Sequence, residues 1–132
     1  MKKILIDSDA LFSLYNPNDA HHARCKKILN ILLSEDTALL TLNLVIQETA
    51  TVLSYKIGQD SAKSFVVDID ALALTHIDLD RELEEKAWEI FLAQTKKGTS
   101  FIDCANLATL HYYNLSGILT FDQFYPKNLR VG

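Results

Sequence analysis

The chain has 132 residues, of which 48% are hydrophobic and 23% are charged, and its net charge is −4. These values are typical of a globular protein with one hydrophobic core, and they exclude a disordered chain. The negative charge argues against a nucleic-acid partner, because such binding is driven largely by Lys and Arg. This argument fails if the excess acidic residues are gathered at one cation-binding site.

We expect a single domain over residues 1–132, because no internal repeat and no Pro- or Gly-rich linker divides the chain. The N-terminus lacks a signal-peptide pattern, and the longest apolar runs are too short to span a bilayer. Cys25 and Cys104 have no metal-ligand spacing and do not form a disulfide framework. We therefore expect reduced thiols, a cytoplasmic location and no membrane association.

Short apolar runs predict strands over residues 4–6, 38–41, 74–77 and 118–120. Apolar residues at helical spacing predict helices over about 22–33, 43–55, 62–69, 81–97 and 101–113. Three of these helices begin at residues suited to an N-cap, namely Asn43, Asp80 and Ser100. Gly58 is expected to end the second helix, and Lys96 and Lys97 to lie near the end of the fourth, before Gly98.

Strands that alternate with helices predict an α/β fold in which a central, mostly parallel sheet is flanked by helices. In such sheets, ligands bind outside the carboxyl ends of the strands. Asp7 and Asp122 follow the first and the last predicted strand. We therefore expect both residues at the same edge of the sheet.

Four acidic residues lie where an apolar element ends or begins: Asp7, Glu48, Asp103 and Asp122. Carboxylates this close to hydrophobic runs are costly unless they are solvated, paired or bound to a metal. No Lys or Arg has a matching placement. Because clustered carboxylate oxygens suit Mg²⁺ or Mn²⁺, these four residues are the candidate metal ligands and catalytic residues.

Each acid also has a simpler explanation. Asp7 can belong to a loop, with Asp9 as the better candidate for capping the helix that follows. Glu48 can lie on the solvated face of its helix. Asp103 matches the third helical position of a capping box, and Asp122 can be a turn residue. The joint occurrence of four acids at element boundaries favours a shared site.

Four segments together resemble the PIN-domain ribonucleases, and most closely the VapC-type toxins of toxin–antitoxin pairs. They read Ile-Leu-Ile-Asp-Ser-Asp-Ala-Leu, Asn-Leu-Val-Ile-Gln-Glu-Thr-Ala, Thr-Ser-Phe-Ile-Asp-Cys-Ala-Asn-Leu-Ala and Ile-Leu-Thr-Phe-Asp-Gln-Phe-Tyr. The order and spacing of the four acids match the family's pattern over nearly the whole chain. The resemblance implies a PIN-like three-layer fold.

The resemblance also implies a function, a metal-dependent endoribonuclease that hydrolyses RNA phosphodiesters with metal-activated water. The four acids would bind Mg²⁺ or Mn²⁺, with Ser8 and Thr120 as supporting hydroxyls. Asp9 departs from the pattern, because many members carry a small polar or neutral residue there, and it would either add an outer carboxylate near the metal or alter the preference between metal ions. A cognate antitoxin and a homodimer are also implied.

Three alternatives remain open from the sequence. A PIN-like protein can bind RNA without cleaving it. In a haloacid-dehalogenase-like phosphatase, Asp7 would be the nucleophile and Asp9 the acid/base, but Ala10 and Leu11 replace the Gly-Thr expected after them. A receiver-like signalling module is also small and α/β, although it needs an acceptor Asp at the end of its middle strand and a late Lys.

Overall fold

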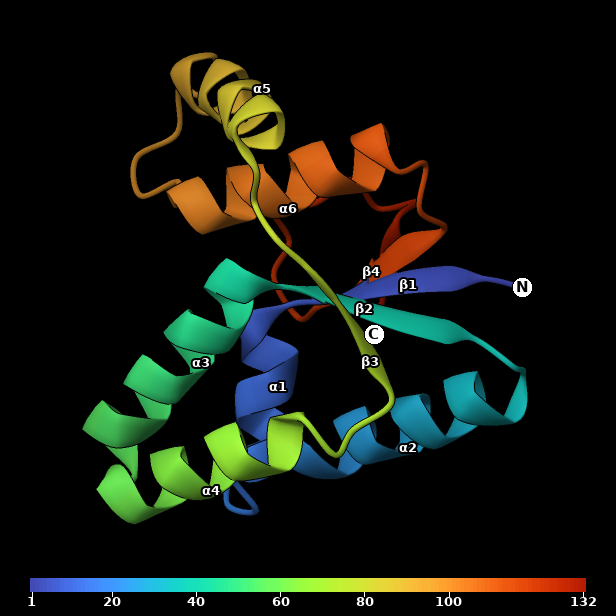
Figure 1. Ribbon diagram of the computed structural model, residues 1–132, viewed down its shortest axis with the longest axis vertical. Helices are drawn as coiled ribbons and strands as arrows, with labels where there is room; N and C mark the ends of the chain where they lie inside the picture. The colour runs from blue at the N-terminus through green and yellow to red at the C-terminus, as the bar shows by residue number, and fades with distance from the viewer.

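The structure, a computed structural model, describes residues 1–132 and contains one sheet of five parallel strands (Figure 1). The strands are β1 (Lys3–Ile6), β2 (Ala38–Leu42), β3 (Leu74–Ile77), β4 (Gly117–Leu119) and β5 (Arg130–Val131). They lie in the order β3-β2-β1-β4-β5. Receiver domains have the order 2-1-3-4-5, so the receiver alternative is wrong.

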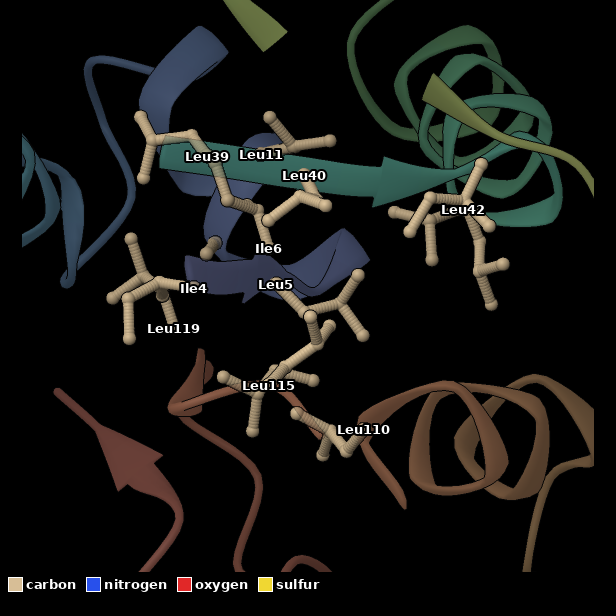
Figure 2. Packing of buried hydrophobic residues seen from close by; sticks show 14 of the residues in the cluster. Ile4, Leu5, Ile6, Leu11, Leu39, Leu40, Leu42, Leu110, Leu115 and Leu119 are labelled. Atoms are coloured by element: carbon tan, nitrogen blue, oxygen red, sulfur yellow. The ribbon is translucent and has the colours of Figure 1, made fainter. Parts of the chain in front are cut away.

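The central strand β1 is buried along almost its whole length. Ile4, Leu5 and Ile6 are each at most 3% exposed. Leu5 lies opposite Leu40 of β2 and Ile118 of β4, and Figure 2 shows leucines of both neighbouring strands beside β1. A strand that is apolar on both faces requires helices on both sides of the sheet.

Six helices supply this cover. On one side of the sheet, α5 (Arg81–Leu92) packs against α6 (Phe101–Tyr112), and the other four lie on the opposite side (Figure 1). These four are α1 (Ser8–Tyr15), α2 (His22–Ser34), α3 (Asn43–Lys56) and α4 (Gln59–Ile69). The predicted α/β fold with a parallel sheet between helical layers is confirmed. No helix combines the length and the apolar character needed to cross a membrane.

Two of the three predicted N-caps are confirmed. The side chains of Asp80 and Ser100 accept hydrogen bonds from the third residues of α5 and α6, at 2.9 Å and 3.0 Å. Asn43 is not a cap, because it is already the first residue of α3. Its Oδ1 instead accepts a hydrogen bond from the Leu79 N–H at 3.0 Å, which ties α3 to the segment after β3.

The end of α5 differs from the prediction. The helix stops at Leu92, so Lys96 and Lys97 lie in the connection to α6 and not in the last helical turn. Gly98 follows them with a φ of 89°, in the left-handed region that favours glycine. Two exposed cationic side chains therefore lie in the connection shortly before the start of α6.

The last strand, β5, was not predicted, because only two residues pair with β4. This pairing brings the backbone of the C-terminal segment very close to Gly117. A Cβ atom at Gly117 would lie only 2.7 Å from the Leu129 carbonyl oxygen, so the approach requires glycine. As a result, the segment after Asp122 folds back beside the carboxyl end of β4.

Candidate functional site

The four candidate acids are all placed at or beside the carboxyl edge of the sheet. Asp7 directly follows β1 and Asp122 follows β4, as expected. Glu48 lies in the second turn of α3, the helix that starts where β2 ends, and Asp103 lies in the first turn of α6. Asp7 is only 3% exposed, Glu48 and Asp103 are half-buried, and Asp122 is exposed.

Asp7 is held by three hydrogen bonds. Its Oδ1 accepts from the Ser8 backbone N–H at 2.8 Å and from Asn106 Nδ2 at 3.1 Å. Its Oδ2 accepts from the Thr120 hydroxyl at 2.9 Å. Asp7 is therefore the N-cap of α1, and the prediction that Asp9 caps this helix is wrong. Burial, followed by the nearby charge of Asp9, raises the Asp7 pKa to about 7.

Asp103 belongs to a network that the sequence did not reveal. Its Oδ1 accepts a hydrogen bond from the Tyr125 hydroxyl at 3.1 Å. Asn106 lies one turn later on α6 and donates both to Asp7 and to the Tyr125 oxygen, the latter at 3.1 Å. Burial and the charges of Asp7 and Asp122 raise the Asp103 pKa to about 6. Burial also raises the Tyr125 pKa, so the phenol stays protonated, donates to Asp103 and is linked to Asp7 only through Asn106.

The two hydroxyls expected to support the site do contact its acids. The Ser8 hydroxyl donates a hydrogen bond to Glu48 Oε1, and thereby joins the start of α1 to α3. The Thr120 hydroxyl donates to Asp7 and accepts from the Asp122 backbone N–H at 3.0 Å. Asp122 also forms the turn considered from the sequence, since its Oδ1 accepts from the Phe124 N–H at 2.9 Å.

Asp9 lies at the border of this cluster. Its Oδ2 accepts a hydrogen bond from the Phe121 N–H at 3.0 Å, which positions the loop that carries Asp122. Its Oδ1 is buried and has no hydrogen-bond partner. Burial raises the Asp9 pKa to about 6, and the charges of Asp122 and Asp103 also act in this direction. Asp9 therefore adds a fifth carboxylate to the same electrostatic environment.

The cluster of acids suits a divalent cation because it consists of carboxylates. Its side chains, however, are not positioned to coordinate one ion together. No Lys or Arg neutralises the acids, because the one ion pair of the chain joins Arg81 to Glu85 on α5. However, no three His, Cys, Asp or Glu side chains are arranged so that they could hold one ion. Several carboxylate oxygens point to hydrogen-bond donors instead. Side chains would have to turn for several acids to bind one ion, so the metal-ligand role of these residues stays a prediction.

The raised pKa values predict that metal-free protein loses stability as the pH rises. Asp7 has a folded pKa of about 7, above its ordinary value of 3.8, so the native state retains a proton that the unfolded state releases. This stabilisation is complete below about pH 4 and lost as the pH rises through about 7, and for Asp7 it is on the order of 4 kcal/mol. In EDTA, the melting temperature should therefore fall between about pH 5 and about pH 8.

Thermal denaturation at several pH values checks this result, with Asp7→Asn as the comparison. The variant carries no titratable group at this position, so its melting temperature should vary less with pH. If the two proteins show the same pH dependence, Asp7 does not titrate as its burial requires.

Comparison with known proteins gives consistent matches. The family model described as "PIN domain" matches residues 4–127. The 23S rRNA-specific endonuclease VapC20 of Mycobacterium tuberculosis is 25% identical over 119 residues, which cover 90% of this chain and 88% of the relative.

Two solved structures share the fold. The crystal structure of Mycobacterium tuberculosis VapC20, described as a Sarcin-Ricin loop cleaving toxin, has a TM-score of 0.81 and 24% identity, with 92% of this chain and 91% of that chain covered. VapBC2 from Rickettsia felis, bound to a DNA fragment from its promoter, has a TM-score of 0.68 and 15% identity, with 91% and 88% covered. At these identities the two structures support the arrangement of strands and helices alone.

Proposed function

The chain belongs to the PIN-domain family, and we propose that it is a divalent-metal-dependent endoribonuclease that acts as the toxin of a VapBC-type toxin–antitoxin system. The observation that carries this proposal is the gathering of Asp7, Glu48, Asp103 and Asp122 at the carboxyl edge of the sheet. Membership of the PIN-domain family also argues against the haloacid-dehalogenase alternative. The match covers residues 4–127, which include Asp7 and the three other acids of the PIN pattern.

In this proposal, Asp7 and Asp103 are the principal ligands of Mg²⁺ or Mn²⁺, and Glu48 and Asp122 complete the site. When bound, such an ion activates a water molecule and stabilises the leaving oxygen of a phosphodiester. The protein's own contribution is to hold the carboxylates. Asn106 and Tyr125 fix Asp7 and Asp103 relative to each other, and the exposed position of Asp122 leaves the edge open to an RNA strand.

The relatives support the biological setting of the proposal. The name of VapC20 supports RNA as the substrate, and the pairing of VapC with VapB in the Rickettsia structure supports a cognate antitoxin as the partner. We further propose that the chain acts in the cytoplasm as a single domain and forms a homodimer.

The direct test is RNA cleavage by the purified protein. We expect Mg²⁺ or Mn²⁺ to give internal cuts in RNA, and EDTA to stop the reaction, because the acids alone cannot activate water. Gel analysis of an end-labelled RNA measures both effects. Cleavage that continues unchanged in EDTA would rule out the metal-dependent reaction.

A second candidate function is RNA binding without cleavage. The observation that favours it is the lack of three acidic side chains already arranged around one position. The two functions differ in a simple way, since a non-cleaving protein would bind RNA and leave it intact with either metal ion.

A further inference from the structure

Two cavities lie on either side of Asp122 and Gln123, which line both of them. The first has a volume of about 540 Å³ and lies between the start of α2 and the C-terminal segment. The second has a volume of about 350 Å³, lies beside the connection between α5 and α6, and is also lined by Asp103. Of the four candidate acids, Asp122 therefore lies at the border between the two hollows, and Asp103 lies at the edge of the second.

Both cavities are lined by cations. Arg24, Lys127 and Arg130 line the first, and Lys96 and Lys97 line the second. These are five of the 13 Lys and Arg residues of a chain whose net charge is −4. None of the five forms an ion pair with a carboxylate, since the one ion pair joins two residues of α5. The Arg24 guanidinium donates one hydrogen bond to the Gly132 carbonyl oxygen, and its remaining N–H groups are not used by a carboxylate.

The first cavity also shows a partly organised arrangement. The Arg24 guanidinium lies 5.6 Å from the centre of the Phe121 ring, and the His21 ring stacks on Phe121 with 4.2 Å between centres. Such packing restricts Arg24 before any ligand arrives. The Arg130 Nε atom is buried without a hydrogen-bond partner. A guanidinium binds phosphate through several donors, so Arg24, held against the Phe121 ring, is suited to a phosphate ligand.

We propose that the two cavities bind backbone phosphates of one RNA strand on opposite sides of the bond that is cleaved. The inference rests on the proposed ribonuclease function and names where the strand lies. Acidic ligands repel a polyanion, so a strand that crosses them gains affinity from cations on each side. Lys96 and Lys97 would hold one flank, and Arg24, Lys127 and Arg130 the other.

Two double variants test the flanks separately: Arg24→Gln with Lys127→Gln, and Lys96→Gln with Lys97→Gln. All four side chains are exposed, so the fold should tolerate the changes. The matched control is Lys2→Gln with Lys63→Gln, which removes the same charge from exposed positions outside both cavities. Binding is measured in an Asp7→Asn background with Mg²⁺, by fluorescence anisotropy of a labelled oligouridylate of about 12 nucleotides.

Each flank variant should bind the oligouridylate about tenfold more weakly than the control near 0.1 M salt. Its plot of log K against log salt should be shallower by about 1.4, because each lost phosphate contact removes about 0.7 from the slope for a single strand. With Asp7 intact, the same changes should raise the KM for RNA cleavage about tenfold and leave kcat within about twofold of the control.

The possible outcomes separate this inference from the proposed function. If the parent protein cleaves RNA but the flank variants bind as the control does, the two-flank inference is overturned and the ribonuclease stands. If binding follows the expected pattern without cleavage by the intact protein, the inference stands and the ribonuclease fails. Unaltered RNA binding together with loss of a protein partner would assign the cations to that partner and overturn the inference, as would a parent protein that binds no RNA.

Discussion

Asp7→Asn is expected to reduce metal-dependent RNA cleavage by about 100-fold or more while the fold is retained. Loss of groups that only support a metal ligand typically costs 10–100-fold, and a neutral amide in place of a principal ligand should cost at least as much. The fold should survive because Asn has nearly the same shape as Asp: its oxygen can still accept from the Ser8 N–H, and its NH2 group can donate to the Thr120 hydroxyl oxygen instead of accepting from it. Cleavage rates at saturating Mn²⁺, with circular dichroism as the check of folding, measure the effect.

Asp70→Asn is the matched control, since it makes the same chemical change at an exposed residue beyond α4. A second readout does not depend on activity. Mn²⁺ should raise the melting temperature of the wild type by binding the native state preferentially, and this rise should shrink in Asp7→Asn but persist in Asp70→Asn. Full cleavage activity in Asp7→Asn would remove the proposed mechanism.

Expression of the chain alone is expected to arrest the growth of a bacterial host. An endoribonuclease whose acidic edge is open to RNA, as the exposed Asp122 indicates, would cut host RNA unless a partner covers it. Asp7→Asn should relieve the arrest, because the variant keeps the surface of the protein and loses the chemistry. Growth curves and viable counts after induction, with protein levels matched by immunoblotting, measure both results.

Co-expression of the small reading frame adjacent to the gene should restore growth if it encodes the antitoxin. A flexible antitoxin segment that folds on binding could cover the acids with a basic side chain. If the wild type is harmless at high expression and the neighbouring product does not bind it, the toxin assignment fails. The ribonuclease assignment is then decided by the cleavage experiment alone.

The sequence was sufficient for elements whose signals are local. Asp80 and Ser100 were identified as caps because each stands directly before an amphipathic run, and the structure shows the expected hydrogen bonds. Asn43 also stands directly before an amphipathic run, but its side chain accepts a hydrogen bond from the backbone of Leu79, far along the chain. The pattern around Asn43 does not distinguish these two uses. The strand β5 was missed for a related reason, because its two residues depend on β4 and on Gly117.

In the candidate site, too, features set by local sequence were predicted and contacts between distant segments were not. The placement of Asp7, Asp103 and Asp122 at element boundaries was visible in the sequence, because strand ends and helix starts are local features, whereas Glu48 lies in the second turn of α3. The link from Asp7 through Asn106 and Tyr125 to Asp103 was not, since it joins three segments that lie far apart in the sequence: the end of β1, α6 and the loop after β4. One signal did exist for Asn106, which lies one turn after Asp103 on α6 and is a buried amide among apolar neighbours. For Tyr125, the sequence gives no comparable signal.

The hydrogen bonds to Asp7 have a consequence for the choice between metal ions. A carboxylate offers about four lone-pair positions, and three donors, Ser8, Asn106 and Thr120, already use this group. Asp7 can therefore bind an ion through one oxygen and not as a bidentate ligand. Calcium requires six to eight oxygens and often takes both from a carboxylate, whereas magnesium keeps much of its own water and needs only one or two carboxylates. If Asp7 is a metal ligand as proposed, the hydrogen bonds that hold it would therefore favour the smaller ion over calcium.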